Sequence, residues 1–163
     1  MVIMNRSLLH RFISVIAFAT VLNVQAQPVG ERLLDNVDVS PGSTACDPEL
    51  AIIKMHYPVR YVTHYPQTTS DEVRIRIRPL RVSQLDRDAL IDRESTGPDR
   101  QHQSLLNEVI YEGDFQGGPY LTLIYNQNVA TKIIQGSDFR SIKVLIYPPE
   151  TLTPDCKSKT FFK

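Results

Sequence analysis

The fold is decided by a short run of alternating residues, VRIRIRP at positions 73–79. Three aliphatic side chains alternate there with three arginines, which is the period of two expected for a β-strand with one apolar face and one charged face. Such a strand can bury its apolar face only against a second layer of structure. The run therefore predicts a half-exposed strand in a two-layered β protein.

Similar strand patterns recur along the chain in the same order and at nearly constant spacing. Residues 33–39 align with 105–111 (offset 72), residues 50–63 with 120–133 (offset 70), and residues 73–79 with 142–148 (offset 69). Small deletions in loops would produce the drift of the offset. We interpret residues 33–79 and 105–148 as two copies of one strand pattern, an internal duplication.

Turn residues separate the predicted strands, and a charged segment separates the two copies. The turns are predicted at residues 56–58 and at the matching residues 126–128. Between the copies, residues 81–103 are predicted to be a solvated connector with one short helix capped by Ser83. The fold class predicted is all-β: a small two-sheet sandwich forming one domain over residues 27–163.

The first 26 residues have the features of a secretory signal peptide. Basic residues precede the apolar run 12–22, and the small residue Ala26 ends the segment. The alternative is a transmembrane anchor, but this run is too short to cross about 30 Å of hydrocarbon at about 1.5 Å per residue. We expect cleavage after Ala26, a periplasmic or secreted mature protein, and no membrane span after cleavage.

Charge and cysteine content exclude several classes of function. The chain has 18 basic and 18 acidic residues, so a nucleic-acid binder that depends on overall positive charge is not expected. Its two cysteines, Cys46 and Cys156, are too few for a four-cysteine zinc site. In an oxidising compartment an isolated pair usually joins, so we predict a disulfide between them, with two free thiols as the alternative.

Residue patterns typical of catalysis are missing from the sequence. No Gly-x-Ser-x-Gly elbow occurs, and His56 and His64 have no acidic residue between them that would complete a metal site. Gly117 and Gly118 are followed by Pro119 rather than by the Gly-Lys-Ser/Thr of a phosphate loop, which favours a turn entering a strand. The sequence therefore predicts a protein that is not an enzyme and that uses no cofactor or metal.

The strand pattern resembles the AMIN domain family. The resemblance is carried by LAII at residues 50–53, Pro58-Val59 and VRIRI at residues 73–77. A second, poorer copy covers residues 120–148, with Asn128-Val129 in place of Pro-Val, and the opening strand at residues 109–113 also suits the family. AMIN modules are small periplasmic β-sandwiches that target amidases and secretins to the bacterial cell envelope, often through peptidoglycan. The chain departs from the family after the last strand of each copy, where Arg78 and Tyr147 stand in place of an acidic residue.

The resemblance implies a non-catalytic binding or localisation module whose partner is peptidoglycan or an envelope protein. The alternative is an accessory subunit of a secretion or pilus machine that pairs through a sheet edge. Candidate ligand-binding residues are Arg74, Arg76 and Arg78, because alternation places all three on one face about 6–7 Å apart. Arginine forks suit carboxylates. The other interpretation of these arginines is a solvated face that discourages edge pairing.

Overall fold

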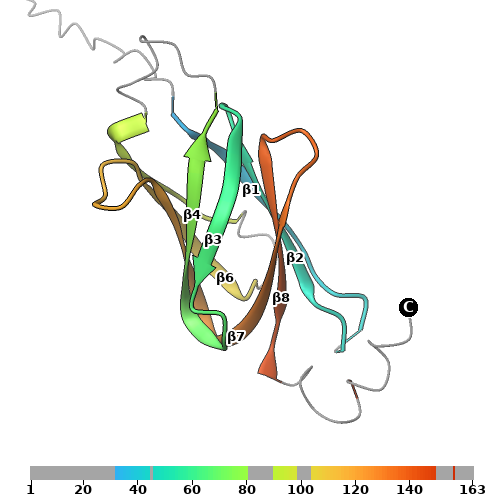
Figure 1. The fold of residues 1–163 in the computed structure, drawn as a ribbon. Coiled ribbons are helices and arrows are strands. Elements are labelled where there is room, and N and C mark those ends of the chain that lie inside the picture. Colours follow the sequence, from blue (N-terminus) through green and yellow to red (C-terminus); the bar gives the residue numbers. More distant parts are fainter. Residues whose placement is uncertain (1–31, 45, 81–89, 99–103, 150–155, 157–163) are drawn as a thin grey trace, which may run out of the picture.

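The computed structural model describes residues 32–44, 46–80, 90–98, 104–149 and 156 (Figure 1). The predicted signal peptide lies outside these residues. Most of the connector helix predicted after Ser83 lies outside them as well. Within the described residues the chain is built almost entirely of β-strands, so the predicted all-β fold class is confirmed.

The described residues form eight strands, and every pairing between these strands is antiparallel. They are β1 (Leu34–Ser40), β2 (Glu49–Met55), β3 (Val59–Tyr65), β4 (Ser70–Pro79), β5 (Arg93–Thr96), β6 (Leu106–Glu112), β7 (Tyr120–Gln135) and β8 (Ser141–Tyr147). All of them except the 16-residue β7 have ordinary lengths, and their alternating burial is typical of two layers that each cover one face of the other.

The strands form two sheets that share one long strand. Sheet A has the order β1-β2-β8-β7, and sheet B has the order β5-β6-β7-β4-β3. Residues 120–124 of β7 pair with β4 and β6 in sheet B, whereas residues 130–135 pair with β8 in sheet A. In Figure 1 the green strands β3 and β4 lie in one layer, and β1, β2 and β8 lie in the other.

The turn predicted at residues 126–128 is wrong, because β7 runs through these residues without ending. In the first copy the matching residues, 56–58, do separate two strands, β2 and β3. Pro58 stands there and has no N–H to donate to a neighbouring strand, whereas Asn128 does. The chain thus changes sheet at both places, through a break in the first copy and within a continuous strand in the second.

Strand pairing repeats between the two halves of the chain, residue for residue. Val37 pairs with Ile53, and Val109 pairs with Leu123, which lie 72 and 70 residues further on. The backbone hydrogen bonds at the ends of these two strand pairings also repeat: His56 N–H donates to Leu33 O and Asn126 N–H donates to Leu105 O, both at 2.9 Å. The halves are therefore related by an approximate two-fold repeat of strand order and register.

Each half contributes its last strand to the sheet of the other half. Strand β4, from the first half, pairs with β7 in sheet B, and β8, from the second half, pairs with β2 in sheet A. Ile53 of β2 faces Ile142 of β8 in the same register in which Leu123 of β7 faces Val73 of β4. Neither half therefore forms a complete sheet alone.

The core lies between the sheets and follows the alternation seen in the sequence. On β4, Val73, Ile75 and Ile77 are at most 1% exposed, and the arginines between them are exposed. The inward residues of β8 that occupy the matching positions, Ile142, Val144 and Ile146, are 0% exposed. Burial of these rows supplies the main drive for folding, at roughly 1.5–3 kcal/mol for each aliphatic side chain.

One part of the connector prediction is wrong. Residues 93–96 form β5, which pairs with β6, and the Glu94 side chain is buried rather than solvated. Its two carboxylate oxygens accept hydrogen bonds from the backbone N–H of Leu33 (2.6 Å) and Leu34 (2.8 Å). A buried charge needs such partners, and here the carboxylate joins the edge of β1 to β5.

A second buried carboxylate, Glu49, joins the start of β2 to the segment entering β6. It accepts hydrogen bonds from Ser104 Oγ (2.6 Å) and Leu105 N–H (3.1 Å). The buried hydroxyl of Tyr125 has no hydrogen-bond partner among the described residues, and burial together with the Glu49 charge raises the pKa of Tyr125. The two glutamates thus hold separate ends of the sandwich.

Candidate binding face

The three arginines predicted as ligand-binding residues lie together on the outward side of β4. Arg74, Arg76 and Arg78 are all exposed, and the residues between them point into the core. Strand β4 lies between β3 and β7, so hydrogen bonds on both sides fix its backbone. The structure therefore presents three arginine side chains from a rigid strand, attached to Cα atoms about 6–7 Å apart along it.

Arg74 is already engaged within the protein. Its Nε lies 3.0 Å from Oε1 of Glu72, which is two residues earlier on the same face of β4. Its guanidinium also lies 5.4 Å from the centre of the Phe115 ring. A carboxylate and an aromatic ring thus both stabilise the positive charge of Arg74.

Phe115 belongs to the loop between β6 and β7, which reaches the outward face of sheet B. Its ring contacts Tyr120 edge-on, with centroids 5.5 Å apart. Gly117 and Gly118 in the same loop have φ angles of 104° and 121°, which favour glycine. A Cβ at Gly118 would lie 3.3 Å from Nε of Arg76, so the missing side chain lets the loop approach this arginine.

A fourth arginine, Arg60 on β3, extends the basic surface. It is exposed and is the direct cross-strand partner of Arg78. We call Arg60, Arg74, Arg76 and Arg78 the arginine face. The sequence does not indicate that Arg60 belongs to this surface, because its cross-strand neighbour depends on the register in which β3 pairs with β4. Among the described residues, Arg74 is the only member of this face that forms an ion pair.

The outward side of sheet A has a different character. Its central strand β8 places Lys143, Leu145 and Tyr147 at the positions that correspond to the β4 arginines, and the neighbouring strand β2 adds Leu50 and Ile52. The lysine is exposed and the four other side chains are half-buried. The exposed lysines of this side, Lys54, Lys132 and Lys143, lie on three different strands, whereas the four arginines of the arginine face lie on the two neighbouring strands β3 and β4.

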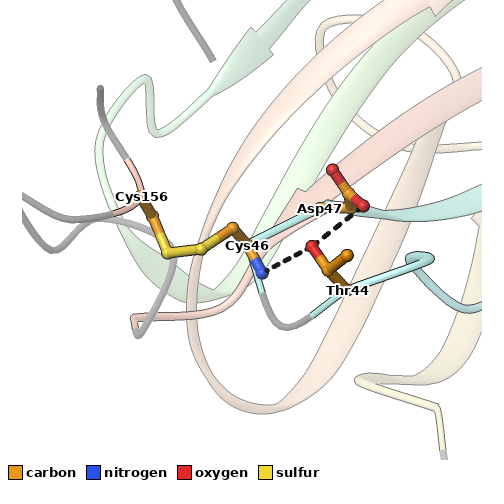
Figure 2. Close-up of a disulfide and its surroundings, with 4 residues drawn as sticks. All are labelled: Thr44, Cys46, Asp47 and Cys156. Carbon is orange, nitrogen blue, oxygen red and sulfur yellow. Dashed lines mark hydrogen bonds between the residues drawn. A yellow bond between two sulfur atoms is a disulfide. The ribbon is translucent and has the colours of Figure 1, made fainter. Parts of the chain in front are cut away.

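The predicted disulfide is present in the structure. Cys46 and Cys156 are joined, and 110 positions of sequence separate them (Figure 2). Cys46 precedes β2 and Cys156 follows β8, which are neighbours in sheet A. Thr44 fixes the turn around Cys46: its Oγ1 accepts the Cys46 N–H (3.3 Å) and donates to Oδ2 of Asp47 (3.0 Å).

His56 and His64 have separate partners in the structure. Nδ1 of His64 is hydrogen-bonded to the hydroxyl of Tyr61 at 2.7 Å, and burial lowers the His64 pKa. His56 lies 3.8 Å from a carboxylate oxygen of Asp35. Over the described ranges no three His, Cys, Asp or Glu side chains cluster as metal ligands.

Within the part of the chain that the structure describes, no helix has the length and apolar character needed to cross a membrane. No family model, no curated protein and no solved structure matches the chain. Membership of the AMIN family therefore stays a prediction from the strand pattern.

Proposed function

We propose that the protein is a non-catalytic binding module of the bacterial cell envelope that holds an anionic component, peptidoglycan or an envelope protein, on the arginine face. One observation carries the proposal: Arg76 and Arg78 stand exposed on a central strand, and no carboxylate within the described residues pairs with them. Guanidinium forks held on a rigid backbone bind carboxylates with directional, charge-assisted hydrogen bonds.

The exported location is part of the same proposal. The disulfide is compatible with an oxidising compartment, where such bonds persist. The signal-like segment before Gln27 supports a periplasmic or secreted protein. Mass spectrometry of the exported protein should find a chain that begins at Gln27, and a chain that retains Met1 would contradict export by cleavage.

The resemblance to AMIN modules supports the envelope as the place of action, and it implies localisation rather than catalysis. Because the overall charge is balanced, attraction of an anionic partner would depend on a local cluster of positive charge such as the arginine face. Binding through exposed arginines weakens as salt increases, because ions screen exposed charges over about 8–10 Å at physiological ionic strength. We therefore expect salt-sensitive binding of moderate affinity.

Pairing through a sheet edge, the second candidate role, has less support. At the edge of β3, the Val59 N–H already donates to Phe139 O (2.7 Å), and the Tyr61 N–H donates to Oε1 of Gln135 (2.6 Å). At the edge of β1, Glu94 occupies the N–H groups of Leu33 and Leu34. These backbone donors are not available to an added strand.

The proposal is tested by sedimentation of the mature protein with isolated cell-wall sacculi and, in a second arm, by capture of envelope proteins. Wild type should bind in one of the two arms. The triple variant R74Q/R76Q/R78Q should bind there with an affinity reduced at least about tenfold. The matched control K132Q/K143Q removes two exposed lysines from the outward side of sheet A and should bind like wild type.

Two results would reject the proposal. The first is a wild-type protein that binds in neither arm. The second is a folded triple variant, with an unchanged melting temperature, that binds as tightly as wild type.

A further inference from the structure

The four arginines of the arginine face differ in what surrounds them. Arg74 has Glu72 and Phe115 as partners, whereas Arg60, Arg76 and Arg78 form no ion pair within the described part of the chain. We infer that Arg60, Arg76 and Arg78 form a binding site for an extended acidic peptide segment, with carboxylates on alternate residues. This inference rests on the proposed function, because it names the class of ligand for the same face.

The Arg60–Arg78 pair is the first reason. The two residues are direct cross-strand partners, and both side chains are exposed. Cβ atoms of such partners lie about 4.5–5.5 Å apart, and like charges at this distance destabilise a sheet. One carboxylate placed between the two guanidiniums would accept hydrogen bonds from both and remove the repulsion.

The spacing along β4 is the second reason. Arg76 and Arg78 are two residues apart on one strand, so they are separated by about 6.5–7 Å. An extended peptide places its alternate side chains at the same interval. A segment of the type acidic-x-acidic can therefore put one carboxylate on Arg76 and the other on the Arg60–Arg78 pair.

The surroundings favour a peptide over a sugar. The Phe115 ring beside the face could stack on a sugar, but Arg74 lies over it and Tyr120 contacts it edge-on. Beyond Arg74, the carboxylate of Glu72 would repel a further acidic side chain. The arginine face thus accepts a short run of acidic residues, and repulsion from Glu72 limits the length of that run.

The segment would lie on the outward surface of β3 and β4 rather than beside β3 as a new strand. The N–H groups of Val59 and Tyr61 on the edge of β3 are already bonded to Phe139 and Gln135. Contact would therefore come from side chains, and the affinity should fall as salt is raised.

The test uses the mature, disulfide-bonded protein and two ten-residue peptides with the same composition. The first peptide alternates glutamate and threonine, and the second is Glu-Glu-Thr-Thr-Glu-Glu-Thr-Thr-Glu-Thr, in which no two glutamates are two residues apart. Fluorescence anisotropy should show tighter binding of the alternating peptide. R60Q, R76Q and R78Q should each weaken that binding about three- to tenfold, whereas R74Q should weaken it less than about twofold. R60K keeps the charge and should bind better than R60Q, and K143Q is the control on the other face.

Equal binding of the two peptides would overturn the proposed spacing. A loss in R74Q as large as the loss in R76Q, with equal melting temperatures, would overturn the assignment of the three arginines. Sacculi provide the third arm: a wild type that binds sacculi but not the alternating peptide would reject the inference and leave the proposed function standing. A wild type that binds neither peptide nor sacculi, and captures no envelope protein, would reject both.

Discussion

Strands β4 and β8 hold matching positions in the two sheets, and their outward sides differ completely. Both lie inside their sheets and pair with β7. Their inward rows are equally buried, at no more than 1% exposed, but β4 carries three exposed arginines outward where β8 carries one lysine and two half-buried apolar residues. Packing between the sheets restricts the inward rows to aliphatic side chains. The outward rows are free of this restriction, so one face can specialise.

The two sheets also differ in how their ends are held. In sheet A the disulfide ties the segment before β2 to the segment after β8. In sheet B the matching strands are β7 and β4, and near the start of β7 a backbone hydrogen bond joins Ile77 N–H to Pro119 O at 3.1 Å. The covalent link is therefore found on one side of the repeat.

Removal of the disulfide should have the largest effect on stability. For the double variant C46S/C156S we expect a loss of about 4–5 kcal/mol in the free energy of unfolding, because a loop of about 110 residues is no longer closed in the unfolded chain. Urea unfolding measures the loss. Amide hydrogen exchange should increase more between β2 and β8 than between β4 and β7, and equal increases in both sheets would contradict a one-sided role.

Truncation of the matching core residues Ile75 and Val144 should test whether the two sheets contribute equally. Both side chains are 0% exposed. I75A should cost about 2–5 kcal/mol, and V144A, which removes fewer atoms, about 1.5–3 kcal/mol. R76A on the outward side should change the free energy of unfolding by no more than about 0.5 kcal/mol. A core variant as mild as R76A would show that the inward rows are not equivalent.

Within the described residues, strand β5 pairs with β6 and has no counterpart beside β1 in sheet A, and Glu94 joins β5 to the edge of β1. E94A leaves two backbone N–H groups without their acceptor and should cost about 1–3 kcal/mol. Hydrogen exchange should report faster exchange at Leu33 and Leu34. D71A is a suitable control, because Asp71 is an exposed acid at the start of β4. Unchanged protection of these two amides would show that Glu94 does not close the sandwich.

Much of this architecture could be predicted from the sequence, because it depends on local alternation. The period of two in residues 73–78 predicted both the buried and the exposed row of β4, and the isolated pair of cysteines in a chain expected to be exported indicated the disulfide. Glu94 could not be predicted to be buried, because its partners, the N–H groups of Leu33 and Leu34, lie about 60 residues away. Arg60 was missed for a similar reason. Its place opposite Arg78 depends on the register of β3, which is set by tertiary packing.

The bulge in β3 places His64 opposite Ile75, and the pH dependence of stability that follows from this is the smallest effect we expect. The pairing of β3 with β4 shifts by one residue between Tyr61 and Thr63, so His64 faces Ile75. On the other side of the repeat, Ile133 of β7 faces Val144. Sheet B therefore has a half-buried histidine where sheet A has an isoleucine packed against the core.

Burial lowers the pKa of His64 below its ordinary value of 6.5, so the folded protein favours the neutral ring, which is hydrogen-bonded to Tyr61. Between the lowered pKa and about 6.5 the unfolded chain binds more protons than the folded one, so this contribution to stability is complete above about pH 6.5 and is lost as the pH falls through the folded value. Urea unfolding should show that the free energy of unfolding decreases more for wild type than for H64I when the pH is lowered from 7.5 to 5. H56Q is the control. NMR titration should place the His64 pKa below 6.5. A His64 pKa above 6.5, or the same pH dependence of stability in wild type and H64I, would show that His64 does not occupy a partly buried site like that of Ile133.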